Sequence, residues 1–215
     1  MSAEERLKKI IAFAEAQRDL AIAENPDYAP RLKYRWQHTL RVTQYGKMLA
    51  EKENADPEQV LAACLLHDIA KLRDRSRDVD HGRVGAKMVR PFLAEIGYTE
   101  AKRENICYAI ATHVDGKADF EHPHSVEAMV VSDADKIDRF SGYRIFFGLR
   151  EALLDEYEAF ILAVRKQLAR LGKAQQKVLI QTKNGKELFD EQISTQIAYL
   201  ERFIADYEKT VLPKF

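Results

Sequence analysis

Apolar residues recur along most of this chain at spacings of three, four and seven, the period of one face of a helix. Asp56 can cap one helix that has Pro57 in its first turn, a position where proline is well tolerated. The chain is therefore expected to be an all-α protein. The predicted helices span residues 3–24, 34–53, 57–71, 81–97, 100–114, 124–139, 141–171 and 186–211.

One short segment departs from this helical period. Residues 178–182 could form a strand, but a lone strand has no partner, so we expect the segment to be helical. No repeat or low-complexity linker divides the 215 residues. We therefore expect a single domain over residues 1–215, with its core at about 30–140 and a C-terminal helical extension at about 141–215.

Several histidines lie on the apolar faces of separate predicted helices. Burying an imidazole without a partner is costly, and a shared metal ion would be one such partner. For each histidine alone, the ordinary alternative is a hydrogen-bonded core residue. His122 and His124 flank Pro123 in a turn and are expected at the surface. The histidines on apolar faces are His38, His67, His81 and His113.

Acidic residues at two places in the chain could complete such a metal site. Asp68 follows His67 at the end of the apolar residues 60–66, where an unpaired carboxylate would be costly to bury. Asp133 and Asp135 lie about 160° apart around a helix, so only one of them should face the site. The helical phase favours Asp135, whose face carries small residues. The alternative for this acidic run is a capped, solvated helix turn.

These residues together resemble the H…HD…D signature of the HD-domain metal-dependent phosphohydrolase superfamily, in its bacterial and archaeal single-domain type. Residues 81–86, 110–113 and 133–138 are similar to further motifs of that type, and the resemblance covers roughly residues 30–205. It implies a helical bundle that binds a divalent ion: Mn, Fe, Co, Ni, Zn or Mg. The implied metal ligands are His38, His67, Asp68 and Asp135.

The resemblance also implies the chemistry. The ion would activate water for attack on phosphorus. His81 and His113 would bind a second ion bridged by Asp68, or contact the phosphate and leaving group, so one or two ions are expected. Lys71, one turn after His67, would neutralise a phosphate oxygen, as in the HDxxK motif of relatives; a solvated helix-end lysine is the alternative. The expected catalytic residues are Asp68, Lys71, His81 and His113.

The expected substrate is a small phosphorylated metabolite, above all a nucleotide or deoxynucleotide that loses phosphate or pyrophosphate. Alarmone hydrolases carry an acidic pair soon after HD, whereas residues 70–73 read Ala-Lys-Leu-Arg, which argues against that type. Arginines in the loop 72–80 and the aromatic and arginine residues of 143–150 are candidate substrate contacts. A non-catalytic metal-binding regulatory or ligand-sensing module is the alternative function.

Charge and cysteine usage narrow the class of partner and the compartment. Lys+Arg and Asp+Glu both number 34, so no basic excess indicates nucleic acid as a constitutive partner. Cys64 and Cys107 lie on apolar helical stretches and are expected to be reduced core residues. The charged N-terminus and the lack of a run of about 18 apolar residues favour a cytoplasmic protein without a membrane partner. The oligomeric state is not predicted.

Overall fold

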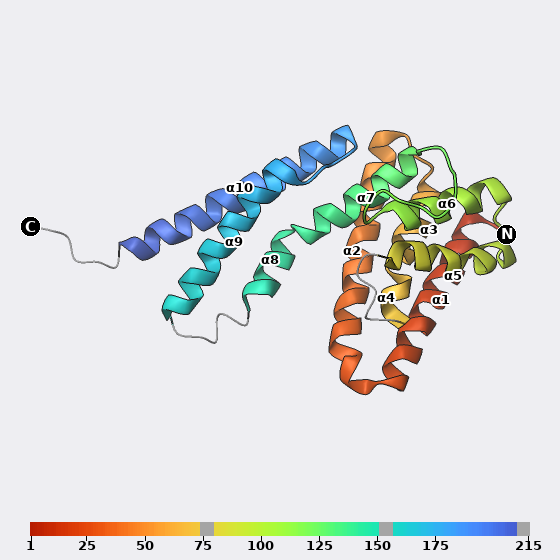
Figure 1. The fold of residues 1–215 in the computed structure, drawn as a ribbon, viewed down its shortest axis with the longest axis horizontal. Helices are drawn as coiled ribbons and strands as arrows, with labels where there is room; N and C mark the ends of the chain where they lie inside the picture. Colours follow the sequence, from red (N-terminus) through yellow and green to blue (C-terminus); the bar gives the residue numbers. More distant parts are fainter. Residues whose placement is uncertain (74–79, 151–156, 210–215) are drawn as a thin grey trace, which may run out of the picture. The chain divides into compact units, whose positions relative to one another are not determined.

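The computed structural model describes residues 1–73, 80–150 and 157–209, and every regular element within these ranges is a helix (Figure 1). The predicted all-α class is therefore confirmed. None of the described helices combines the length and the apolar character that a membrane span requires.

The chain divides into two compact units. The first comprises Met1–Asp135 with Gln181–Gly185, and the second comprises Lys136–Ile180 with Lys186–Phe215. The first contains α1 (Ala3–Glu24), the short helix η1 (Pro26–Tyr28), α2 (Ala29–Glu53), α3 (Pro57–Leu66), α4 (Ile69–Arg73), α5 (His81–Glu95) and α6 (Glu100–Thr112). Helix α7 (Val126–Arg139) contributes to both units.

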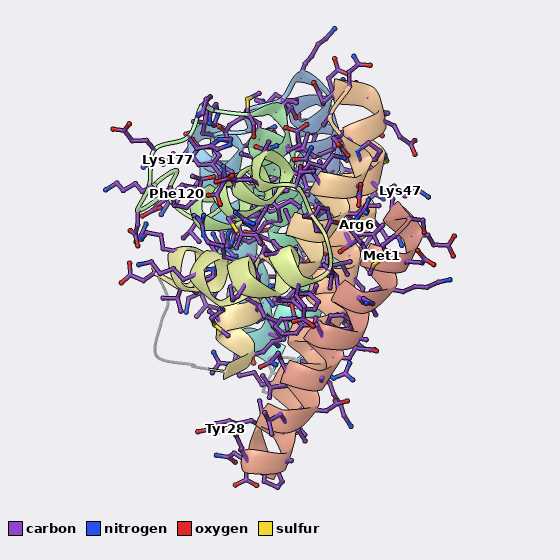
Figure 2. All side chains as sticks on the ribbon, turned by 90° about the vertical axis from the view of Figure 1, so that its right-hand side faces the viewer. Met1, Arg6, Tyr28, Lys47, Phe120 and Lys177 are labelled. Carbon is purple, nitrogen blue, oxygen red and sulfur yellow. The ribbon has the colours of Figure 1, made fainter. Side chains whose placement is uncertain are left out.

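Helix α3 lies at the centre of the first unit. It is apolar around its whole circumference, so it requires neighbours on several sides, and α1, α2 and α6 pack against it. Gly46 allows α2 to come close, because a Cβ there would lie 2.6 Å from the Cys64 sulfur. Helices α1 and α2 form a hairpin that turns at η1, with Tyr28 at its far end (Figure 2).

Two predicted helices of this unit differ from the observed ones by more than two residues. Helix α2 begins at Ala29 instead of residue 34, because Pro30 occupies its first turn, where a missing N–H costs no hydrogen bond. The helix expected over residues 57–71 is interrupted: α3 ends at Leu66 and α4 begins at Ile69. The interruption falls at His67-Asp68, and it places these two side chains at a helix junction.

The second unit is built from α8 (Gly142–Leu149), α9 (Tyr157–Lys177) and most of α10 (Lys183–Glu208). Helices α9 and α10 run antiparallel, since Phe160 packs on Phe203 at one end and Gln175 donates to Ser194 Oγ nearer the other. The single helix expected over 141–171 was wrong. Helix α8 ends at Leu149 and α9 continues to Lys177, while residues 151–156 lie outside the described residues.

Residues 178–182 are neither helix nor strand, which corrects the helical prediction. The carboxylate of Asp133 accepts hydrogen bonds from the backbone N–H groups of Gln181 and Thr182, at 2.9 Å and 2.7 Å, and from Thr182 Oγ1 at 2.8 Å. A buried carboxylate thus satisfies backbone donors at the approach to α10, so the segment has no need of helical partners.

Candidate metal centre

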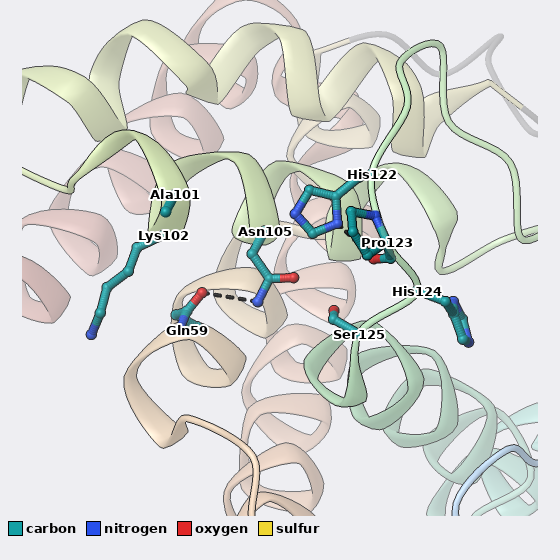
Figure 3. Close-up of a pocket in the computed structure, with 8 residues that line it drawn as sticks. All are labelled: Gln59, Ala101, Lys102, Asn105, His122, Pro123, His124 and Ser125. Atoms are coloured by element: carbon teal, nitrogen blue, oxygen red, sulfur yellow. Dashed lines mark hydrogen bonds between the residues drawn. The ribbon is translucent and has the colours of Figure 1, made fainter.

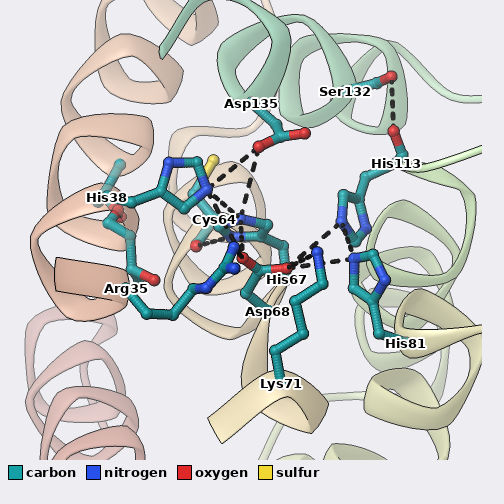
Figure 4. A network of polar contacts seen from close by, with 12 residues as sticks. Arg35, His38, Cys64, His67, Asp68, Lys71, His81, His113, Ser132 and Asp135 are labelled. Carbon is teal, nitrogen blue, oxygen red and sulfur yellow. Dashed lines mark hydrogen bonds and ion pairs between the residues drawn. The ribbon is translucent and has the colours of Figure 1, made fainter. Parts of the chain in front are cut away.

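The residues predicted to bind metal converge in the first unit, although they come from five places in the chain (Figure 4). Helix α2 contributes His38, the α3–α4 junction His67 and Asp68, the start of α5 His81, the end of α6 His113, and α7 Asp135. The four histidines and Asp68 are buried, and the Asp135 side chain is 19% exposed.

Two of the histidines have a defined proton position. His67 Nδ1 and His113 Nδ1 each lie 2.7 Å from a backbone carbonyl oxygen three residues earlier, that of Cys64 and that of Ile110. A carbonyl oxygen only accepts, so Nδ1 carries the proton and Nε2 presents its lone pair to the centre. Burial lowers the pKa of His67, and it lowers the pKa of His113 to about 3, so both rings are neutral at pH 7.

Asp68 lies between two pairs of histidines. Its Oδ2 atom is 3.6 Å from Nε2 of both His38 and His67. Its Oδ1 atom is 3.2 Å from His81 Nε2 and 4.0 Å from His113 Nε2. One carboxylate therefore presents one oxygen to each pair, as a group that bridges two cations would.

Asp135, and not Asp133, faces this centre. Its Oδ1 atom lies 3.2 Å from His38 Nε2 and 3.9 Å from His67 Nε2. Asp133 is turned toward Gln181 and Thr182. The two aspartates thus have different partners, as their helical phase indicates.

Both carboxylates of the centre are ionised despite their burial. Burial alone would raise the pKa of Asp68, but His67, a hydrogen bond from His81, and the cations of Arg35 and Lys71 hold it well below its usual value. Burial also acts to raise the pKa of Asp135, and the hydrogen bond and charge of His38 outweigh it. The centre therefore holds two negative charges beside the Nε2 lone pairs of His67 and His113.

This donor set suits a divalent cation. The ligand atoms of His38, His67 and Asp135 lie within 4.8 Å of one another, and so do those of His67, Asp68 and His113. Imidazole nitrogen with carboxylate oxygen is a usual set for transition ions. Lone pairs directed at ionised carboxylates repel one another unless a cation lies between them, so the residues present fit a bound metal ion.

A comparison with known families decides what this arrangement is. Residues 35–139 match the HD domain. This range contains all six of these side chains. The resemblance drawn from the H…HD…D residues is thereby confirmed.

Known relatives agree with this assignment. Ribonuclease Y of Geobacter sulfurreducens is 27% identical over 176 residues, which are 71% of this chain and 31% of that protein. Ribonuclease Y of Nitratidesulfovibrio vulgaris is 33% identical over 121 residues, which are 56% of this chain and 20% of that protein. The chain thus spans about a third or less of the curated relatives it matches.

Solved structures show the same fold over nearly the whole chain. A protein described as a predicted HD superfamily hydrolase, from an uncultured Thermotogales bacterium, has a TM-score of 0.65 and 20% identity, with 96% of this chain and 99% of that one covered. Bacillus subtilis YpgQ in complex with ADP has a TM-score of 0.60 and 21% identity, with 98% and 97% covered. The HD-domain helical fold is therefore confirmed.

Close contact between α5 and α6 brings two histidines of the HD domain together. His81 Nε2 and His113 Nε2 are 3.0 Å apart. The residue after His81 is Gly82, where a Cβ would lie 2.7 Å from the carbonyl oxygens of Ile110 and Ala111. The absence of a side chain at Gly82 therefore lets α5 approach the α6 backbone closely enough for the two rings to meet.

Two polar contacts of the HD domain were not predicted from the sequence. Arg35 Nη1 lies 2.7 Å from Asp68 Oδ2, and Ser132 Oγ donates to the carbonyl oxygen of His113 at 3.2 Å. Arg35 precedes His38 by one helical turn, and that spacing was the available signal. Lys71, which was predicted, has its Nζ 3.4 Å from Asp68 Oδ1, with 19% of the side chain exposed.

The remaining candidates lie elsewhere. The His122 ring stacks on Tyr108, and His124 interacts with Tyr108 and Gln181. Both histidines line a separate pocket in which Asn105 donates to Gln59 (Figure 3), and neither belongs to the metal-ligand groups of the described residues. Residues 74–79 of the charged loop lie outside the described residues, so their proposed substrate contacts stay predictions.

Proposed function

We propose that this HD-domain protein is a divalent-metal-dependent phosphohydrolase that acts on a small phosphate ester, preferably a nucleotide. The observation that carries the proposal is the placement of Asp68, with one oxygen toward His38 and His67 and the other toward His81. An ionised carboxylate that lies between histidines is suited to holding metal ions beside a phosphate.

The proposed metal ligands follow from these contacts. His38, His67, Asp68 and Asp135 would hold one divalent ion. A cation held there supplies Lewis-acid charge to a phosphate oxygen and lowers the pKa of a water molecule toward neutrality. His113 carries its proton on Nδ1, so its Nε2 atom can act as a ligand and not as a proton donor. This favours a second ion held by His81, His113 and the other oxygen of Asp68.

The substrate's negative charge would be met by two cations of the chain. Arg35 and Lys71 each contact a different oxygen of Asp68, at 2.7 Å and 3.4 Å. A phosphate group that enters the centre can replace Asp68 as their partner, since guanidinium and ammonium groups bind phosphate oxygens strongly. Both side chains then orient the phosphate and neutralise charge that develops on it.

The preference for a nucleotide is supported by a structural neighbour, YpgQ, which was solved in complex with ADP. The Ribonuclease Y relatives make RNA a conceivable substrate, but they extend well beyond the part that this chain matches. The equal numbers of basic and acidic residues in this chain, 34 of each, favour a small ligand over a nucleic acid.

The test is a substrate panel with defined metal loading. The full chain is stripped with chelator, reloaded with Mn²⁺, Co²⁺ or Mg²⁺, and offered mono-, di-, tri- and cyclic nucleotides, with release of phosphate and pyrophosphate measured. We expect hydrolysis that requires metal and that is lost in His67→Ala but kept in His122→Ala. A metal-loaded protein inert toward the whole panel would favour the regulatory module instead.

A further inference from the structure

Each of the two histidines proposed to hold a second ion is followed, two residues later, by one member of an ion pair. His81 begins α5 and His113 follows the last residue of α6, and their rings face each other (Figure 4). Arg83 comes two residues after His81, and Asp115 two residues after His113. Arg83 Nη1 lies 3.0 Å from both carboxylate oxygens of Asp115. One ion pair therefore joins the two segments that carry the histidines.

The Arg83 guanidinium also has carboxylate partners on both sides of this junction. Its Nη2 atom pairs with Asp80, the residue before His81. Its Nε atom lies 3.8 Å from Asp119 Oδ1, in the chain that follows α6. The Arg83 side chain is only 15% exposed, so water screens these attractions less than it does at an open surface. A single planar group thus holds the start of α5 and the chain after α6 together.

The distance between the two histidines matters for an ion that both of them hold. Nitrogen ligands lie about 2.0–2.1 Å from an ion such as Zn²⁺, so two of them on one ion lie roughly 3 Å apart. The Nε2 atoms of His81 and His113 are 3.0 Å apart, which meets this requirement. Gly82 permits the close approach of α5 to α6, but it has no side chain that could maintain it. The ion pair of Arg83 provides that restraint.

A second ion pair joins the same two helices farther from the histidines. Arg90 Nη1 of α5 pairs with Glu104 of α6. Arg90 lies seven residues after Arg83, which is roughly 10 Å along a helix. The chain therefore offers two ion pairs between α5 and α6, and one of them lies beside the histidines.

We propose that Arg83 is a positioning residue for the second metal ion, because it holds His81 and His113 at a separation that suits two ligands of one cation. The inference rests on the proposed function, which places an ion between these histidines and Asp68. Without the ion pair, the start of α5 and the end of α6 can move apart, and affinity for that ion falls. Within the described part of the chain, none of the carboxylates that pair with Arg83 is a proposed ligand; they are Asp80, Asp115 and Asp119.

The experiment titrates the metal-free full chain with Co²⁺. Calorimetry counts the ions bound per chain, and the visible absorption of Co²⁺ reports the ligands around them. We expect wild type to bind two ions. Arg83→Gln should bind the second ion about tenfold to a hundredfold more weakly, the usual effect of losing the support behind a metal ligand, and should keep its affinity for the first. Asp115→Asn should give the same loss, and the double variant little more, because both substitutions break one pair.

Arg90→Gln is the matched control, since it breaks an ion pair between the same two helices away from the histidines. It should keep wild-type affinity for both ions. The inference is overturned if Arg83→Gln, shown to be folded by circular dichroism, binds two ions like wild type. It is also overturned if Arg90→Gln weakens the second ion equally, or if wild type binds only one ion. A wild type that binds no ion would contradict the proposed function as well.

Discussion

Each carboxylate oxygen of Asp68 forms an ion pair with a different cationic side chain. Oδ2 pairs with Arg35, and Oδ1 pairs with Lys71. Only a carboxylate offers two such acceptors in one small side chain, and here both oxygens also face imidazole nitrogens. The two cations are therefore poised beside the place that a substrate phosphate would occupy, and they are expected to affect turnover more than stability.

Lys71→Met should lower kcat by roughly tenfold to a thousandfold, with a smaller change in KM, because the ammonium group neutralises charge that grows in the transition state. Steady-state kinetics of the metal-loaded protein measure this. Lys47→Met, at an exposed position of α2, is the matched control. Unchanged kinetics in Lys71→Met would mean that Lys71 pairs with Asp68 in the folded protein but takes no part in turnover.

Asp135→Asn should weaken metal binding, whereas Asp133→Asn should weaken the fold. Asp135→Asn removes a charge that faces His38 and His67, so metal affinity should fall by at least about a hundredfold. Asp133→Asn weakens the bonds to residues 181–182 and should lower the free energy of unfolding by about 1–3 kcal/mol while metal is retained. Metal titration and urea unfolding of both variants test whether Asp135 is the metal ligand. Loss of metal binding in Asp133→Asn together with its retention in Asp135→Asn would contradict this assignment.

Acid should destabilise the metal-free protein. The unfolded chain protonates its histidines near pH 6.5, whereas native His113 resists protonation down to a pKa of about 3, so the unfolded state binds more protons in between. The lowered pKa of Asp68 adds stability that is present above pH of about 4 and is lost as the pH falls further.

Urea unfolding in EDTA at a series of pH values tests this. The free energy of unfolding should decrease from pH 7 to pH 4, and His113→Gln should reduce the slope. His122→Gln, which replaces a histidine outside the centre, should keep the wild-type slope. Stability that rises on acidification would contradict the buried, neutral state of His113.

At the level of the helices, the approach of α5 to α6 depends on Gly82. Gly82→Ala would place a methyl group 2.7 Å from two carbonyl oxygens, and because these belong to the backbone, α5 must shift. We expect a loss of about 1–3 kcal/mol in unfolding free energy and weaker metal binding through His81. Gly172→Ala in α9, where a Cβ meets nothing within 4 Å, should instead stabilise the helix by about 0.5–1 kcal/mol.

The helices show what a sequence pattern can and cannot predict. Helix α1 spans the residues that its period indicates, because its apolar face and its caps are local features. The break at His67-Asp68 was not predicted, since the apolar run continues up to it and the interruption depends on the contacts of both side chains. The irregular residues 178–182 depend on Asp133, which lies some fifty positions earlier in the chain.

For the molecule as a whole, the periodicity of apolar residues was sufficient to predict the all-α class, and the H…HD…D residues were sufficient to predict the HD domain over residues 35–139. The prediction that four histidines converge rested on the cost of burying each one alone and on the resemblance to the H…HD…D signature. Arg35 was missed although it precedes His38 by one helical turn, because that spacing alone does not identify Asp68 as its partner. The close contact at Gly82 likewise depends on how two helices pack.

The metal content of the purified chain tests the proposed centre. Protein prepared without chelator and examined by elemental analysis should carry one or two divalent ions per chain, because two ionised carboxylates and four buried histidines need a shared cation. Asp68→Asn should carry almost none, whereas His124→Ala should match wild type. Full metal content in Asp68→Asn would contradict the account.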